Sequence, residues 1–358
     1  MADTTPLDPD ALAAYSFTVW SYKQGEMISV LIHIGDRLGL FTSLAGAGPV
    51  TSAELAATTG LDERLLHEWL LAMGAARLVE VHDSMAFELS DEGAAVLADE
   101  QHSTAFALGT FRGGIEPAVL DLVIDSFRTG VGITYEQQGP KAAAGLARMT
   151  GPFSRKALTS RILPGLDGVD AKLQAGARVL DVGCGSGVSA CLIAAAYPAS
   201  TIIGYDPSAI AVANAVDHAA AQGLTNVSFV CAGAADIPPS GDIDLALTFD
   251  CLHDMARPDL ALAAIRGSMA DDGTLLIKDI RSSGEFAKDR RNPLLALFYS
   301  FSVTSCLQSA VSEPGGLGLG TLGLHPAKAR ELTADAGFSR FEQHDFDDAA
   351  NLYYEVRP

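Results

Sequence analysis

Apolar residues in the second half of the chain fall into short runs that alternate with amphipathic stretches. Each run has the length and the β-branched content of a buried strand, and the stretches between the runs have helical spacing. The expected strands are 178–183, 201–206, 227–231, 243–249 and 274–279. The expected helices between them are 188–197, 208–222 and 258–270. Strands and helices that alternate in this way predict an α/β domain with a doubly wound, parallel sheet.

The last part of the chain departs from this alternation. We expect a long helix over 286–310, a glycine-rich loop at 315–320 and a helix over 326–336. Two further apolar runs, 340–346 and 352–356, then lie close together in sequence. They predict an antiparallel hairpin added to the edge of the sheet.

The first hundred residues are mainly helical. Apolar positions between 11 and 45 follow helical spacing, and Thr51 with Glu54 forms a capping-box pattern at the start of the next helix. A helix over 62–73 then leads into two short strands, which is a winged-helix pattern. The first helix is unusually apolar for a solitary surface helix, so we expect it to pair with a second subunit.

Residues 103–170 predict further helices that are interrupted by Gly-Gly and Gly-Pro pairs. We therefore expect three parts. Residues 1–102 form a helical, winged-helix-like dimerisation domain, and 103–170 form a helical bridge that contributes to a substrate pocket. Residues 171–358 form the sheet domain, with a helical lid at about 285–323.

The charge excludes several kinds of partner. The 358 residues carry a net charge of −20, which repels nucleic acid and anionic membranes. Between residues 50 and 100 there are eleven acidic and two basic side chains, a poor balance for a helix that reads DNA. The uncharged run 294–311 is too polar to span a membrane. The favoured partner is a small molecule.

Two features predict a cytoplasmic protein. The five cysteines are widely spread and form no CxxC pair, which favours reduced thiols. The amino terminus is acidic and polar and has no signal-peptide pattern.

The most informative segment is Val179–Gly187, a strand that runs into a turn with three glycines. Asp181 lies inside the strand, and Asp206 ends the next apolar run. Glycine turns of this type admit an adenosine cofactor close to the backbone. The third glycine of a dinucleotide fingerprint is replaced by Val188, and a carboxylate in the strand suits a cation. These features favour S-adenosyl-L-methionine, which carries a sulfonium and an ammonium group, over NAD.

The turn Asp181–Gly187 resembles the first motif of class I S-adenosylmethionine-dependent methyltransferases. Residues 1–110 and 170–358 together resemble the members that carry an N-terminal winged-helix dimerisation domain, among them small-molecule O-methyltransferases. The segments Tyr135–Pro140, Leu252–Met255 and Asn351–Glu355 are similar to a poorly assigned actinobacterial branch. The resemblance implies a seven-stranded doubly wound sheet, mostly parallel, with an antiparallel C-terminal hairpin. It also implies a homodimer.

The resemblance assigns residues to the cofactor. Gly183, Cys184 and Gly185 are expected to contact its methionine part and ribose, with Asp181 nearby. Asp206 is expected to accept hydrogen bonds from the ribose hydroxyls, with Pro207 restraining the turn. The remaining cofactor-binding residues implied are Ala234, Ala235 and Asp236 beside the adenine, and Asp250 beside the ammonium group or the donor methyl. Gly233 stands where the family usually has an aspartate, so the adenine contact has to come from elsewhere.

The resemblance also implies the catalytic residues. His253 is expected to be the general base that removes a proton from an acceptor hydroxyl. Asp279 or Glu313 orients its ring, and Asp254 caps the following helix. Two alternatives remain open: C- or N-methylation on the same fold, and a winged-helix transcription regulator that senses S-adenosylmethionine. A metal shared by His253 and His325 has no support in their spacing, so we predict no metal ligand.

Overall fold

The computed structural model describes residues 7–102, 104, 109–111, 113–139 and 141–358. The chain divides into two compact units, Met1–Gly114 and Ile115–Pro358. Each unit is described by itself, and the predicted division into three parts stays a prediction.

The first unit has the winged-helix arrangement expected from the sequence. Its elements are α1 (Pro9–Arg37), α2 (Leu40–Leu44), α3 (Ser52–Thr59), α4 (Glu63–Ala75), β1 (Glu80–Val81), β2 (Phe87–Glu88) and α5 (Asp91–Leu97). The predicted capping box at Thr51 and Glu54 opens α3. Phe41, Leu70, Met73 and Phe87 form the centre of the core and are almost fully buried.

The first helix ends earlier than predicted. It was expected to continue to residue 45, but α1 stops at Arg37 and α2 starts after Gly39. Gly39 has φ +68°, a left-handed conformation that ends a helix at little cost only when the residue lacks a Cβ.

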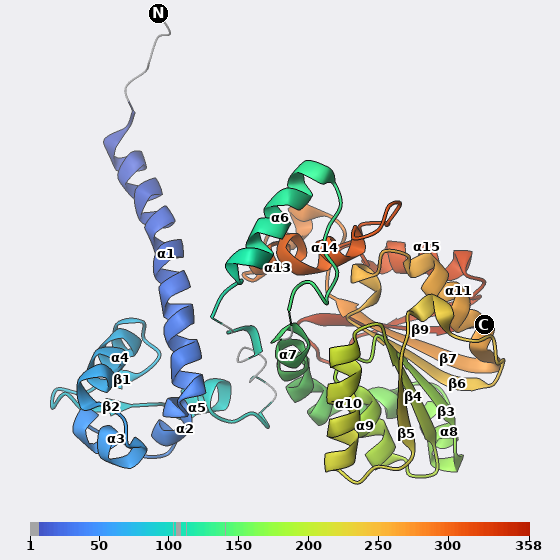
Figure 1. The fold of residues 1–358 in the computed structure, drawn as a ribbon, viewed down its shortest axis with the longest axis horizontal. Helices are drawn as coiled ribbons and strands as arrows, with labels where there is room; N and C mark the ends of the chain where they lie inside the picture. The colour runs from blue at the N-terminus through green and yellow to red at the C-terminus, as the bar shows by residue number, and fades with distance from the viewer. Residues whose placement is uncertain (1–6, 103, 105–108, 112, 140) are drawn as a thin grey trace, which may run out of the picture. The chain divides into compact units, whose positions relative to one another are not determined.

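The second unit contains the seven-stranded sheet (Figure 1). Its strands are β3 (Arg178–Val182), β4 (Thr201–Asp206), β5 (Val227–Cys231), β6 (Ile243–Phe249), β7 (Met269–Ile280), β8 (Arg340–His344) and β9 (Asn351–Arg357). Their spatial order is β5-β4-β3-β6-β7-β9-β8. The first five strands in this spatial order, β5, β4, β3, β6 and β7, are parallel to one another. Strand β9 runs antiparallel to both β7 and β8. The predicted sheet and its antiparallel C-terminal hairpin are confirmed.

Helices cover both faces of this sheet. They are α8 (Val169–Ala175), α9 (Val188–Ala196), α10 (Ala209–Ala221), α11 (Pro258–Ser268) and α15 (Pro326–Asp335). One buried cluster joins the sheet to α11 and α15, and another joins it to α8 and α9. Strand order reverses at β3, because β4 lies on one side of it and β6 on the other. In an open α/β sheet, the ligand crevice lies at the carboxyl ends of the strands beside such a reversal.

Apart from two short turns that follow β5 and β6, the other helices described in this unit lie in two sequence segments. The first holds α6 (Pro117–Thr129), α7 (Lys141–Ala157), η2 (Leu158–Ile162) and η3 (Leu163–Gly165), and the second holds α12 (Phe286–Asp289), α13 (Leu295–Phe301), η6 (Ser302–Cys306) and α14 (Leu307–Ala310). The segments contact one another, since Ser305 donates a hydrogen bond to Gln138 at 2.6 Å.

The prediction of one continuous helix over 286–310 is wrong in detail. The segment is broken between α12 and α13, where Pro293 lies. Proline has no backbone N–H and disfavours helical geometry in the residue before it, which explains the break.

Strand β7 starts at Met269, before the predicted residue 274, and its pairing with β6 is irregular between Ile243 and Leu245. Among the described residues, no helix combines the length and the apolar content needed to cross a membrane.

Candidate active site

The glycine turn between β3 and α9 lies where the strand order reverses. All three glycines, Gly183, Gly185 and Gly187, have left-handed φ angles of +53° to +72°. A Cβ on Gly183 would lie 2.8 Å from Cys251, and one on Gly187 would lie 2.8 Å from side-chain atoms of α10 and β5. A Cβ on Gly185 would meet nothing within 4 Å. Gly183 and Gly187 therefore allow the turn to pack, and Gly185 presents bare backbone to open space.

Asp206, at the carboxyl end of β4, fixes this turn. Its Oδ2 accepts a hydrogen bond from the Gly185 amide at 2.9 Å, and its Oδ1 accepts one from the Ser208 amide at 2.9 Å. Burial raises the pKa of Asp206 above its ordinary value. Each carboxylate oxygen has a further lone pair, so two hydroxyls of a ligand can still bind here. Pro207 follows directly in the chain.

Asp181 lies beneath the turn and is almost fully buried in β3. Its Oδ2 has no hydrogen-bond partner among the described residues. Burial raises the pKa of Asp181 to about 7, although a backbone hydrogen bond from Ala190 acts in the opposite direction. A buried carboxylate oxygen without a partner is costly unless a cation or a donor meets it. The site therefore fits a cationic cofactor such as S-adenosylmethionine.

The other residues predicted for the cofactor lie along the same edge of the sheet. Cys184 is in the turn, where its amide bonds to the carbonyl of Tyr205 at 3.1 Å. Ala234, Ala235 and Asp236 form a short 3₁₀ turn, η4 (Ala234–Asp236), after β5. The backbone that leads into this turn is bonded to the carbonyl of Asp206. The fold thus brings the β3, β4 and β5 segments together.

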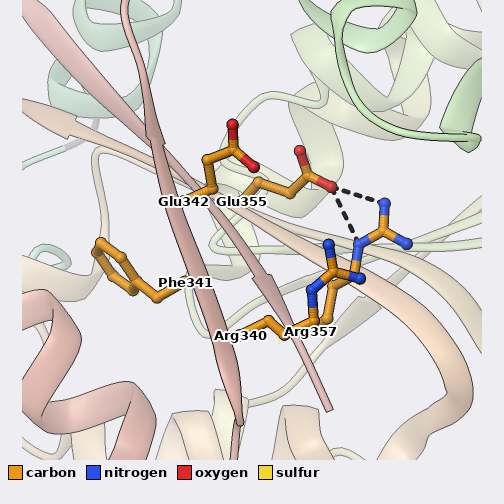
Figure 2. A pocket seen from close by; sticks show the side chains of 5 residues that line it. All are labelled: Arg340, Phe341, Glu342, Glu355 and Arg357. Atoms are coloured by element: carbon orange, nitrogen blue, oxygen red, sulfur yellow. Dashed lines mark hydrogen bonds and ion pairs between the residues drawn. The ribbon is translucent and has the colours of Figure 1, made fainter.

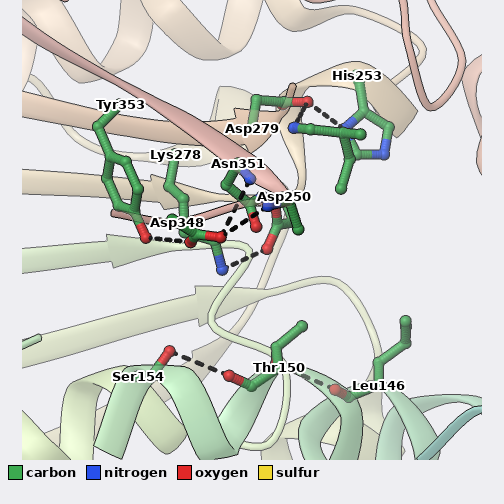
Figure 3. Close-up of polar contacts among 12 residues, drawn as sticks. Leu146, Thr150, Ser154, Asp250, His253, Lys278, Asp279, Asp348, Asn351 and Tyr353 are labelled. Carbon is green, nitrogen blue, oxygen red and sulfur yellow. Dashed lines mark hydrogen bonds and ion pairs between the residues drawn. The ribbon is translucent and has the colours of Figure 1, made fainter. Parts of the chain in front are cut away.

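Asp250 lies at the end of β6 in a left-handed conformation, with φ +54°. Both carboxylate oxygens of Asp250 contact other side chains of the protein (Figure 3). One oxygen pairs with Lys278 Nζ at 2.5 Å, and the other accepts a hydrogen bond from the Asn351 amide group at 2.5 Å. Neither partner was predicted. The sequence signal for Lys278 is a charged residue inside an otherwise apolar strand. A role of Asp250 toward the cofactor stays a prediction.

His253 and Asp279 form a buried pair. His253 lies in the short turn η5 (Leu252–Asp254) after β6, and Asp279 lies near the end of β7. The ring Nδ1 is 2.8 Å from Asp279 Oδ1, and the two residues are 2% and 1% exposed. Asp279 and Glu313 were both candidates for orienting the ring of His253. Asp279 is hydrogen-bonded to the ring, whereas Glu313 is exposed to solvent.

The surroundings of this pair set its charge. Burial by itself lowers the pKa of His253, but the negative charge of Asp279 and its hydrogen bond, together with Cys306, raise it well above its ordinary value. Burial raises the pKa of Asp279, and His253 acts against this. Because Asp279 accepts the Nδ1 proton, the other ring nitrogen, Nε2, is available as a proton acceptor when the ring is neutral.

Asp254 does not cap the following helix, and that prediction is wrong. Its Oδ2 accepts a hydrogen bond from the Tyr135 hydroxyl at 2.7 Å, and α11 begins at Pro258 without a side-chain cap. Asp254 is 8% exposed, and burial raises its pKa to about 7 against the opposing effects of His253 and Tyr135. The tertiary contact with Tyr135 draws the carboxyl inward, beside His253.

The glycine-rich loop covers this region. The Gly320 amide bonds to the carbonyl of His253 at 3.0 Å, and the Leu317 amide bonds to that of Ala256 at 2.9 Å. His325, which we considered as a metal partner, caps α15 through a hydrogen bond from the Lys328 amide at 3.4 Å.

A separate shallow pocket lies on the edge strand β8 and its neighbour β9 (Figure 2). Its lining residues are Arg340, Phe341, Glu342, Glu355 and Arg357. Glu355 is paired with Arg357 at 2.6 Å and with His344 at 3.0 Å. The register of β9 on β7 places this pocket at the end of the sheet opposite Asn351. It is therefore not part of the site around His253.

Comparisons with known proteins agree with this geometry. Residues 173–302 match the model of a methyltransferase domain, and residues 26–99 match that of an Rv2258c-like winged helix-turn-helix domain. None of the curated proteins matches the chain.

Solved structures share the whole fold. A mitomycin 7-O-methyltransferase is 20% identical, with a TM-score of 0.70, and the match covers 98% of this chain and 99% of that one. Human N-acetylserotonin methyltransferase in complex with S-adenosylmethionine is 18% identical, with a TM-score of 0.69 and coverage of 100% and 99%. An N,N-8-amino-8-demethyl-D-riboflavin dimethyltransferase from Streptomyces davawensis is 23% identical, with a TM-score of 0.57 and coverage of 96% and 98%. At these identities the similarity concerns the fold.

Proposed function

We propose that this chain, a class I S-adenosylmethionine-dependent methyltransferase with an N-terminal winged-helix domain, methylates a hydroxyl group of a small aromatic molecule. The observation that carries the proposal is the buried pair of His253 and Asp279 beside the glycine turn. The likeness to a mitomycin 7-O-methyltransferase supports the choice of oxygen.

The residues around the turn fit the cofactor. Asp181 offers an unpartnered carboxylate oxygen to its cationic groups, and Asp206 offers two oxygens to its ribose hydroxyls. Gly185 leaves space for the ligand, and we expect the η4 turn to contact the adenine. When bound, S-adenosylmethionine supplies the electrophilic methyl group.

The protein has to position the acceptor and remove its proton. His253 Nε2 accepts the proton of the hydroxyl, while Asp279 keeps the ring in the required tautomer and stabilises the imidazolium that forms. A phenol, whose pKa is about 10, loses its proton to such a base far more readily than an aliphatic alcohol does. Aromatic hydroxyls are therefore the preferred acceptors.

We also propose that the part of the predicted bridge that belongs to the second unit, residues 115–139 and 141–170, and the lid at about 285–323 form walls of the acceptor pocket. Tyr135 of the bridge bonds to Asp254 beside His253, and Gln138 bonds to Ser305 of the lid. The aromatic ring of Tyr135 and the covering loop exclude water from the reacting groups.

The acceptor class is tested with isotopically labelled cofactor and a matched set of phenols, anilines and carbon nucleophiles. We expect the label on oxygen, with the product mass and its position read by mass spectrometry and NMR. Labelling of anilines but not of the corresponding phenols would instead establish N-methylation, the reaction named for the riboflavin-derivative dimethyltransferase. Absence of transfer to every member, with binding to DNA in a gel shift, would support the regulator alternative.

We further propose that the enzyme is a homodimer that pairs through α1. Leu12, Tyr15, Val19 and Tyr22 recur at intervals of three and four residues along this 29-residue helix, and all are exposed. Phe17 and Trp20 add to the exposed apolar surface. A second copy of the same helix is the occupant that covers such a stripe symmetrically.

Light scattering after gel filtration tests the dimer. We expect twice the 37.3 kDa of one chain for the native protein, and one chain for the double variant Tyr15→Glu, Val19→Glu. The control is Ala53→Glu, Ala57→Glu on the exposed face of α3, which adds the same charge and should stay dimeric. A monomeric native protein at micromolar concentration would contradict the proposal.

We propose a cytoplasmic location, because all five cysteines are free. Recovery of the native protein in the membrane or secreted fraction would contradict it.

A further inference from the structure

A cluster of three potential metal ligands lies beside the catalytic pair. His253, Asp254 and Cys306 place one ligand atom each within 4.8 Å of the others. The first two residues come from η5, and Cys306 is the last residue of η6. No local sequence pattern points to this cluster, because Asp254 and Cys306 are 52 positions apart.

Imidazole, carboxylate and thiolate are the donors that zinc prefers, and sites with three protein ligands leave a fourth position open. Zinc bonds of about 2.0–2.3 Å put neighbouring ligand atoms roughly 3.3–3.8 Å apart. Since no two ligand atoms of the cluster are more than 4.8 Å apart, each separation has to shorten by at most about 1–1.5 Å to reach this geometry. Cys306 is only half-buried and lies in a π-helical turn, so its side chain has room to adjust.

The groups around the cluster hold these ligands as the outer shell of a metal site does. Asp279 binds Nδ1 of His253 at 2.8 Å, so Nε2, the nitrogen on the side of Cys306, is the ring atom left for a metal. The Tyr135 hydroxyl binds Oδ2 of Asp254 at 2.7 Å and leaves Oδ1. Carboxylates and hydroxyls in this position orient ligands in known metal sites and raise metal affinity.

Two other clusters of similar composition lack this feature. In the cluster of Glu80, His82 and Glu88, the histidine Nε2 is bonded directly to Glu88 at 2.9 Å. In the cluster of Glu342, His344 and Glu355, the Nε2 is bonded to Glu355 at 3.0 Å, and Arg357 holds the other oxygen of that carboxylate. Within each of these two clusters, potential metal ligands are therefore already hydrogen-bonded to one another.

We propose that His253, Asp254 and Cys306 bind a zinc ion. On binding, the Cys306 thiol, the His253 imidazolium and the protonated fraction of Asp254 release their protons to solvent. The thiolate and the Asp254 carboxylate then balance the two charges of the ion, and the ring of His253 binds as a neutral imidazole. The ion occupies Nε2 of His253, the atom that accepts the acceptor's proton in the proposed function. Zinc therefore inhibits methyl transfer. This consequence rests on the proposed function, whereas the binding does not.

The test uses the full chain without an affinity tag, first stripped with a chelator. Titration against a chromophoric zinc indicator should give one ion per chain at micromolar affinity or better. Cobalt(II) in place of zinc should give the thiolate-to-metal charge-transfer band that requires a cysteine ligand. Cys306→Ala should weaken zinc binding at least 100-fold and abolish the band.

Two control variants locate the ion. Cys231→Ala removes an exposed cysteine outside the cluster, and His344→Ala breaks the cluster on the edge strands. Both should keep the native affinity and the band. Native affinity in Cys306→Ala, or loss of binding in His344→Ala, would overturn the site.

Methyl transfer measured with and without the chelator separates this inference from the proposed function. Transfer to oxygen without zinc binding would overturn only the zinc site. Zinc binding that depends on Cys306, without transfer to oxygen, would overturn only the proposed acceptor.

Discussion

Replacing His253 by alanine is expected to lower kcat by about 10²–10⁴-fold, because the acceptor hydroxyl then loses the base that we propose for it. Binding of S-adenosylhomocysteine should change little, since the turn and Asp206 are untouched. Calorimetry and single-turnover kinetics with labelled cofactor measure the two effects separately. Asp279→Asn should also lower kcat, because the asparagine does not stabilise the imidazolium.

The pH profile supplies a second check on His253. The pKa of His253 is raised above its ordinary value, and only the neutral ring accepts a proton. We therefore expect kcat/KM to increase with pH until this group is deprotonated. The control is His344→Ala, a histidine that is also paired with a carboxylate but lies on the edge strand β8, two strands away from β7. Equal turnover in His253→Ala and the native enzyme would remove the proposed base.

The free protein is expected to lose stability as the pH rises from about 4 to 8, and Asp181 supplies a large share. Its pKa is about 7 in the folded chain against an ordinary value of 3.8, so the folded state binds the proton more tightly than the unfolded state. Stability then falls wherever the folded state holds more protons. The difference between the two values corresponds to about 4 kcal/mol.

Urea unfolding of the cofactor-free protein across this pH range measures the effect. Asp181→Asn should remove a large share of the decrease. Asp254, whose pKa is also about 7, and the raised pKa of Asp206, Asp279 and His253 account for the remainder. Asp217→Asn, on the exposed surface of α10, should leave the native profile unchanged. Added cofactor should restore more stability at pH 8 than at pH 5, because the ionised carboxylate meets its cation. A profile that rises with pH would contradict the assignment.

The cofactor side of the site could be predicted from the sequence because its signals are local. Gly183, Gly185 and Gly187 set the turn within a few residues, and Asp206 ends the strand that follows. Parallel strands place their carboxyl ends along one edge of the sheet, so these segments had to meet there. The same local rules predicted the capping box at Thr51 and the order of strands and helices.

The details around the acceptor depended on contacts between distant residues. Tyr135 bonds to Asp254 across 119 positions, and Asn351 bonds to Asp250 across 101. Neither pairing has a signal in the residues nearby. The prediction that Asp254 caps a helix was wrong because the tertiary contact with Tyr135 outweighs a local turn preference.

Neighbouring residues were enough to predict the sheet, the glycine turn and the candidate base, because strand alternation, turn geometry and strand ends are local properties of the chain. The groups that surround His253 became known only from the three-dimensional fold. Asp279 and Cys306 reach it from β7 and η6, and their approach depends on the spatial order of strands and the packing of the lid segment. Packing of that kind is set by the whole chain, so no window of neighbouring residues contains it.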